Sequence, residues 1–134
     1  MSNLADAFIA AVSCRDADAL RATLAAEVRF FSPVVFKPYE GAELVGTILA
    51  EGAMKVFEDD FTYLHRFEDS TRRTAALVFR ATAAGKLLDG LDLLTFDGDG
   101  QIVELRVMVR PISALQALAG AMQERFQVLG LLPG

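Results

Sequence analysis

The sequence predicts an α+β fold, with helices near both ends of the chain and a run of antiparallel strands between them. Three observations predict it. Apolar residues recur at helical spacing in the first part of the chain and again near its carboxyl end. After the acidic run at residues 58–60, the period of the apolar pattern changes from about 3.6 residues to about 2. Residues 97–100 (Asp-Gly-Asp-Gly) have the composition of a hairpin turn, and helices segregated from hairpin strands are typical of this class.

The amino-terminal part of the chain is predicted to form three helices and one strand. Apolar spacing predicts a helix over about residues 3–13. Asp16 is typical of a helix N-cap, and the second helix, which it opens, is predicted to run through Leu24. The short β-branched and aromatic stretch 28–31 predicts a strand, and a third helix follows over about 41–56.

The remainder is predicted to form four consecutive strands and a last helix. The strands are predicted at 61–68, 73–83, 87–96 and 101–110, and the helix at about 115–126. A twisted sheet with helices against one face leaves a space between the two layers. We therefore expect a pocket between the sheet and the helices.

Composition limits the classes of function. The net charge is −5 and Lys and Arg are nowhere clustered, which argues against a nucleic-acid partner. The 134 residues are too few for two good cores, so residues 1–134 are predicted to form a single domain. No cluster of histidines or cysteines and no glycine-rich phosphate loop is found, so we expect no metal and no cofactor.

The compartment is inferred from the same inventory. Cys14 is the one cysteine, which rules out an internal disulfide and suits a reducing environment. The chain begins without the pattern of a signal peptide, and no apolar run approaches the ~20 residues of a membrane span. We therefore expect a cytoplasmic protein with no membrane partner.

One acidic side chain, Asp92, stands within an apolar strand. It shares a face of that strand with Leu94, and its direction depends on the length of the following hairpin loop. A two- or four-residue loop sets Asp92 beside Leu105 and Val107, facing the helices. A three-residue loop sets it beside Arg106 on the outer face. We favour the first arrangement, because it gathers the apolar residues of both strands on one face.

Two interpretations of Asp92 stay open. It is either a structural acid, hydrogen-bonded to a neighbour or ion-paired with an arginine, or a pocket carboxyl whose pKa is raised by desolvation. Alternation along 61–68 sets Tyr63 and His65 on one apolar face with Phe67. If that face is the inner one, Asp92 orients the imidazole of His65 for proton transfer, or shares the pocket with the Tyr63 hydroxyl. The alternative for His65 is an ordinary core or rim residue.

The order of elements, together with residues 90–97 (Gly-Leu-Asp-Leu-Leu-Thr-Phe-Asp) and 100–104 (Gly-Gln-Ile-Val-Glu), resembles the nuclear transport factor two-like superfamily. SnoaL-like polyketide cyclases and ketosteroid isomerases belong to it. The resemblance implies a cone-shaped fold, in which a strongly curved antiparallel sheet is packed by N-terminal helices around a deep apolar pocket, with a C-terminal helix. It also implies a homodimer built on the outer sheet face.

Ketosteroid isomerases use a protonated aspartic acid and a tyrosine to stabilise an oxyanion, while a second aspartate moves the proton. Asp92 matches the first aspartic acid in its spacing to the following Phe-Asp pair. The position of the general base holds Ser32, and the position of the tyrosine on the first helix holds Phe8. The resemblance therefore implies a family member without the isomerase machinery.

The sequence thus predicts a protein that binds a small hydrophobic molecule, polyketide- or steroid-like, with Asp92 as its polar anchor. One alternative is a cofactor-free isomerase, cyclase or dehydratase that uses Asp92 with His65 or Tyr63. Another is a dimeric scaffold without a ligand, in which the pocket is collapsed core. The side chains expected to line the pocket are Phe8, Ser32, Tyr39, Leu77, Phe79, Leu94, Leu105 and Val107.

Overall fold

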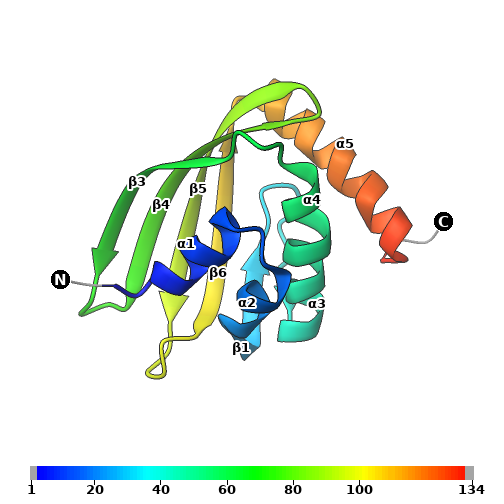
Figure 1. Cartoon of the computed structure of the whole chain (residues 1–134). Coiled ribbons are helices and arrows are strands. Elements are labelled where there is room, and N and C mark those ends of the chain that lie inside the picture. Colours follow the sequence, from blue (N-terminus) through cyan, green and yellow to red (C-terminus); the bar gives the residue numbers. More distant parts are fainter. Residues whose placement is uncertain (1–2, 132–134) are drawn as a thin grey trace.

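A six-stranded sheet with the strand order β2-β1-β6-β5-β4-β3 forms the frame of the computed structural model, which describes residues 3–131. β1 runs parallel to β6, and every other neighbouring pair is antiparallel. The sheet is strongly curved and does not close (Figure 1). The strands are β1 (Leu24–Phe31), β2 (Tyr39–Glu40), β3 (Thr62–Asp69), β4 (Thr74–Ala83), β5 (Lys86–Phe96) and β6 (Ile102–Arg110).

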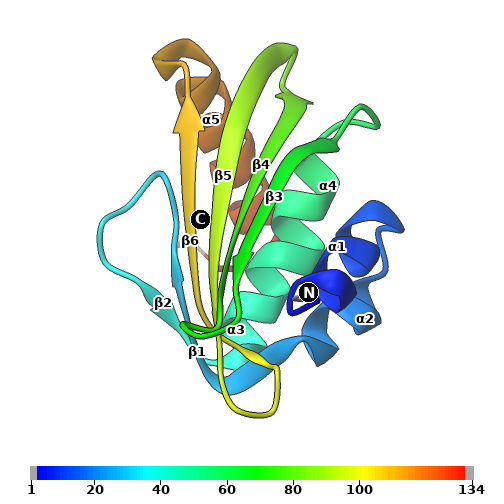
Figure 2. The same cartoon turned by 90° about the vertical axis from the view of Figure 1, so that its left-hand side faces the viewer.

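The helices cover the concave face of this sheet, and Figure 2 looks onto the opposite, outer face. α3, η1 and α4 follow one another without a break, and η1 is a π-helical segment within them. No helix in residues 3–131 is long and apolar enough to cross a membrane. The helices are α1 (Asp6–Ser13), α2 (Ala17–Ala22), α3 (Ala42–Thr47), η1 (Ile48–Ala53), α4 (Met54–Val56) and α5 (Ile112–Leu129).

The predicted α+β class is confirmed, with differences at the ends of elements. Asp16 caps α2 as predicted, because its carboxylate accepts the backbone N–H of Ala19 at 3.0 Å. The helix ends at Ala22, however, and Leu24 already belongs to β1 rather than to the helix. β2 was not predicted, since two residues are too few to show an alternating pattern.

An extra residue in β3 changes which side chains face the helices. Tyr63 pairs with Phe79 of β4, but His65 pairs with Val78, so Leu64 is a β-bulge between the two pairs. Phe79 is buried on the concave face, and the neighbouring Val78 points the other way. Tyr63 therefore faces inward and His65 faces outward. The predicted shared face of these two residues is wrong for this reason.

A second bulge decides the direction of Asp92. Asp97 donates its backbone N–H to the carbonyl of Gln101 at 2.8 Å, so the loop between β5 and β6 has three residues, 98–100. The last of these is a glycine with a φ of +81°, as a type I turn with a following left-handed residue requires. The expected loop length was therefore wrong. The bulge at Val103 shifts the register back, and Asp92 faces inward nonetheless.

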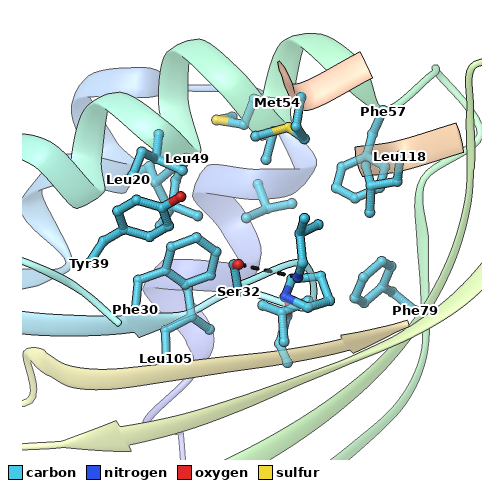
Figure 3. A pocket seen from close by; sticks show the side chains of 18 of the residues that line it. Leu20, Phe30, Ser32, Tyr39, Leu49, Met54, Phe57, Phe79, Leu105 and Leu118 are labelled. Carbon is cyan, nitrogen blue, oxygen red and sulfur yellow. Dashed lines mark hydrogen bonds between the residues drawn. The ribbon is translucent and has the colours of Figure 1, made fainter. Parts of the chain in front are cut away.

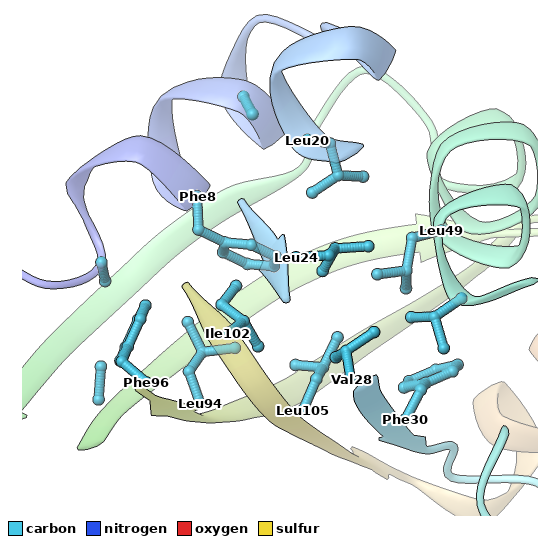
Figure 4. Packing of buried hydrophobic residues seen from close by; sticks show 14 of the residues in the cluster. Phe8, Leu20, Leu24, Val28, Phe30, Leu49, Leu94, Phe96, Ile102 and Leu105 are labelled. Carbon is cyan, nitrogen blue, oxygen red and sulfur yellow. The ribbon is translucent and has the colours of Figure 1, made fainter. Parts of the chain in front are cut away.

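The main core lies between the concave face and the amino-terminal helices. Phe8 of α1 and Leu20 of α2 point toward the sheet, where they pack with Leu24, Val28 and Leu94 (Figure 4). These five side chains are at most 5% exposed. This core holds α1 and α2 against the sheet and so forms one wall of the site described next.

Candidate functional site

A cavity of about 410 Å³ lies between the concave face of the sheet and the helices. Its size falls within the range of small-molecule pockets, roughly 300–1,000 Å³. The lining comes from nearly every element and is mostly aliphatic and aromatic; in Figure 3, Tyr39 and Phe30 stand at one end, with Phe57, Phe79 and Leu118 at the other. The polar or charged side chains that line it are Arg15, Ser32, Tyr39, Tyr63, Asp92 and Gln123.

Asp92 is the one polar or charged residue within residues 3–131 that is buried as a whole, at 7% exposure. It lies in the middle of β5, where its strand neighbours are Leu77 of β4 and Val107 of β6. The hydroxyl of Tyr63 donates a hydrogen bond to its Oδ2 at 3.3 Å. No hydrogen bond to Oδ1 is found among the described residues, and no buried side-chain oxygen is left without a partner, so Oδ1 is accessible from the cavity.

Burial changes the acidity of both members of this pair. Desolvation raises the pKa of Asp92 from the ordinary aspartate range to about 7, and the hydrogen bond from Tyr63 opposes the rise only in part. Burial, and then the charge of Asp92, raises the pKa of Tyr63 well above its usual value. Near neutral pH, Asp92 is therefore divided between its two forms. It donates a hydrogen bond when protonated and accepts a hydrogen bond or a proton when ionised.

Within residues 3–131 Asp92 is not ion-paired with an arginine, so that part of the structural interpretation is wrong, whereas the hydrogen bond to a neighbour is formed with Tyr63. No cation among the described residues contributes to its pKa. Arg15 is the one cationic side chain that lines the cavity, and its guanidinium is occupied elsewhere. It donates to the backbone carbonyls of Met54 at 2.6 Å, Phe57 at 3.0 Å and Glu58 at 2.7 Å. The carboxyl thus sits in an apolar cavity without a counter-charge.

Most of the side chains that the sequence pointed to lie around this cavity. Those that line it are Phe8, Ser32, Tyr39, Tyr63, Phe79, Asp92, Leu105 and Val107. Leu77 and Leu94 do not, because both are 0% exposed and packed in the main core. They share the concave face with Asp92, but they are packed in the main core together with Phe8 and Leu20 of the amino-terminal helices.

His65 lies outside the site. The bulge at Leu64 turns it to the outer face, where its ring stacks on Phe67 with 6.2 Å between ring centroids. An Asp92–His65 pair across the pocket is therefore not formed, and a mechanism in which this histidine moves a proton in the cavity is excluded by position.

The end of the cavity near Asp92 has aromatic walls that sequence patterns revealed only in part. Phe57 and Phe61 flank the acidic run 58–60 and pack with Tyr63 and Phe79, with neighbouring ring centroids 4.8–6.3 Å apart. The sequence feature that could have pointed to these walls was one aromatic residue on each side of a charged turn. Alternation placed Phe61 at the start of the predicted strand 61–68, but it lies with Phe57 in the connection between α4 and β3, where periodicity does not give the direction of a side chain.

Exposed residues of the β1–β2 loop and of α5 belong to the lining of the cavity. Val34, Val35 and Gln123 line it and are exposed. Ser32 holds the loop, since its Oγ accepts the backbone N–H groups of Val34 at 3.3 Å and Val35 at 3.1 Å. Tyr39, in β2, packs against Phe30 and Phe126 at the same end. Polar groups thus lie at both ends of an apolar chamber.

The curved sheet, the covering helices and the pocket define the nuclear transport factor two-like, or cystatin-like, fold. Residues 5–105 match the model of the SnoaL-like domain, and the chain belongs to that family. No curated protein matches the chain.

Solved structures agree with this assignment. The chain is similar to the crystal structure of a steroid delta-isomerase from Pseudomonas aeruginosa, with 36% identity, a TM-score of 0.87 and 98% of each chain covered. A protein with a cystatin-like fold from Silicibacter pomeroyi has 28% identity and a TM-score of 0.87 over 95% of this chain and 87% of that chain. A nuclear transport factor two-like protein from Cytophaga hutchinsonii, at 21% identity and a TM-score of 0.65, covers 84% and 91% and shares the fold.

Proposed function

We propose that this protein binds a small hydrophobic molecule, polyketide- or steroid-like, in the cavity, and that Asp92 is the polar anchor of the ligand. We also take residues 1–134 to act as one SnoaL-like domain. The observation that carries the proposal is the one carboxyl in the lining of a largely apolar chamber of about 410 Å³, which is buried and has one oxygen free. Such a chamber favours an apolar body, and the carboxyl selects where the polar group of the ligand lies.

Apolar contact and the hydrogen bond to Asp92 contribute differently to ligand binding. Apolar contact supplies most of the affinity, at roughly 25 cal/mol for each Å² removed from water. A hydrogen bond to the carboxyl adds about 1.5–3 kcal/mol, which is about tenfold to 150-fold in affinity. Asp92 therefore decides which hydrophobic molecules bind and in which orientation.

The experiment compares a steroid ketone with the hydrocarbon that lacks its carbonyl group. Calorimetry measures both affinities for the wild type, Asp92→Ala and Asp89→Asn. Asp89 is a matched control, because it lies on β5 but pairs with arginines on the outer face. We expect Asp92→Ala to weaken ketone binding at least tenfold relative to the hydrocarbon and Asp89→Asn to change neither. Equal losses for both ligands in Asp92→Ala, or no binding to any variant, would contradict the proposal.

A second candidate is a cofactor-free isomerase, cyclase or dehydratase in which Asp92 acts with Tyr63. A carboxyl whose pKa lies near 7 is suited to proton transfer at neutral pH, which favours this candidate. Ser32 and Phe8 stand where the isomerases have a base and a tyrosine, which disfavours it. Nuclear magnetic resonance of the bound ketone in D₂O separates the two. Deuterium entering the α-carbon with the wild type but not with Asp92→Ala supports catalysis, and its absence supports binding alone.

The open cavity argues against the third candidate, a scaffold with a collapsed pocket. We infer that the protein forms a homodimer through its outer sheet face, which carries exposed apolar side chains such as Phe67 and Met108. The exposed free thiol of Cys14 suits the reducing cytoplasm, where we place the protein. The net charge of −5 argues against a nucleic-acid partner.

A further inference from the structure

The negative charge of Asp92 is not neutralised by a cation within residues 3–131. Within residues 3–131 its pKa responds to burial and to Tyr63 and to no cation, and its Oδ1 is free toward the cavity. The titratable or charged groups that line the cavity with it are Tyr63 of β3, Tyr39 of β2 and Arg15 of the α1–α2 turn. The lining residues from β4, β6, η1, α4 and α5 carry no such group. Arg15 is held by backbone carbonyls and does not neutralise the carboxyl.

The aromatic residues at the same end of the cavity supply a second feature that attracts cations. Tyr63, which contacts the carboxyl, has its ring centroid 5.1 Å from that of Phe61, and Phe61 stacks on Phe79 at 4.8 Å. Phe57 completes the group at 5.4 Å from Phe61. The face of an aromatic ring carries partial negative charge and attracts ammonium groups, with about 2 kcal/mol or more when the pair is desolvated.

We propose that the pocket takes a hydrophobic amine, whose protonated nitrogen donates to Oδ1 of Asp92 and lies against these rings while its apolar body fills the chamber. This inference rests on the proposed function and specifies its ligand class. The net charge of −5 adds a weak attraction for cations at a distance.

The balance of desolvation favours an amine over a neutral isostere of the same shape. Moving an ammonium group out of water is costly, and the cost is offset only by a well-placed opposite charge. Folding has already desolvated that opposite charge in Asp92, so the ligand alone is desolvated on binding. A neutral alcohol gains one hydrogen bond and no charge interaction. The amine holds Asp92 ionised, so its binding near pH 7 releases a proton from the carboxyl.

The experiment uses three rigid probes of one shape: 1-adamantylamine, 1-adamantanol and 2-adamantanone. Calorimetry at pH 5.5 and pH 8.5 measures their affinities for the whole chain as the wild type, Asp92→Asn and the control Asp89→Asn. We expect the wild type and the control to prefer the amine over the alcohol at least tenfold at pH 8.5. The preference disappears at pH 5.5 and in Asp92→Asn. Two buffers of different ionisation enthalpy should show proton release on amine binding near pH 7.

The outcomes distinguish the two claims. Binding of the alcohol or the ketone without a preference for the amine at pH 8.5 overturns this inference and leaves the proposed function standing. A preference that persists in Asp92→Asn also overturns it, because the charge is then elsewhere. If none of the three probes binds at millimolar concentration, the proposed function and this inference both fail.

Discussion

Asp92 makes the folded state less stable at high pH than at low pH. A carboxyl that ionises at about 7 when folded and near 4 when unfolded keeps its proton longer in the native state. Between these values the folded chain binds more protons than the unfolded chain, so the free energy of unfolding falls as pH rises. The whole shift corresponds to roughly 4 kcal/mol. A group that destabilises the fold is typical of a site kept for binding or catalysis.

Asp92→Asn should therefore be more stable than the wild type above pH 7 and about equally stable near pH 4. The amide has the shape of the carboxyl and still accepts the Tyr63 hydrogen bond, but it is never charged. Urea unfolding of both proteins from pH 4 to pH 9 gives the difference in free energy, in which the titration of all other groups cancels. A difference that does not change with pH would mean that Asp92 is not desolvated.

Gly90 leaves room for the ring of Phe79, which lines the pocket. A Cβ at Gly90 would lie 2.1 Å from the ring of Phe79, so Gly90→Ala must push the ring out of place. We expect a loss of about 1–3 kcal/mol from overpacking. Gly98→Ala is the control, because a Cβ there meets nothing within 4 Å. Urea unfolding checks the prediction, which fails if the two variants are equally stable.

At the scale of elements, Arg15 ties the amino-terminal helices to the end of α4. The residue has a φ of +51° and its side chain spans to three carbonyls of residues 54–58. These contacts close the side of the cavity where Val12, Met54 and Phe57 lie. The strained backbone indicates that the side-chain contacts hold the turn in place.

Arg15→Ala should loosen α1 and α2 more than the sheet. We expect a loss of about 1–3 kcal/mol in global stability and faster amide hydrogen exchange in residues 6–22 than in β4 and β5. Arg72→Ala is the control, since Arg72 is exposed and pairs only with the nearby Asp69. Exchange that is equally fast in both variants would show that the turn holds without Arg15.

Strand alternation in the sequence was enough to predict most of β5, because side chains on a strand point to opposite faces in turn. It was not enough at the bulges. Leu64 and Val103 look like any other strand residue, and an extra residue is recognised only against the partner strand. The first bulge separates Tyr63 from His65, and the second compensates for the three-residue loop. The inward direction of Asp92 was therefore predicted correctly, although the predicted loop length was wrong.

The lining residues that come from connections and helices were harder to predict than those on the strands. Leu105 and Val107 follow from the alternation of β6, whereas Arg15, Phe57 and Gln123 come from connections and from α5. Where these meet depends on how the helices cross the sheet, and hydrophobic periodicity carries no information on that. Leu77 and Leu94 were expected in the lining, but both are packed within the main core.

At the scale of the whole molecule, the outer face of the sheet is the surface on which a second copy is expected. Leu91 and Leu93 lie there, partly exposed, beside Met108 at 53% exposure. Ion pairs surround this apolar strip, among them Asp89 with Arg80 and Arg110. A charged rim around an apolar centre is the usual anatomy of an interface.

We expect the wild type to sediment as a dimer at micromolar concentration. Met108→Glu should shift it to monomer, because a charge in the centre of the face is buried without a partner. Gln127→Glu adds the same charge at an exposed position on α5 and should leave the dimer intact. Analytical ultracentrifugation of the three proteins measures their oligomeric states. A wild-type monomer, or a dimer that tolerates Met108→Glu, would exclude this face as the interface.

The proposed function depends most on Asp92 as a buried carboxyl that contacts the ligand. The direct measurement is the titration of its ¹³C-labelled carboxyl by nuclear magnetic resonance, with and without 1-adamantylamine, assigned by loss of the signal in Asp92→Asn. We predict a pKa of about 7 in the free protein, because burial raises it, and a fall of at least one unit when the amine is bound. A pKa near 4 that does not change on addition of the amine would contradict the account.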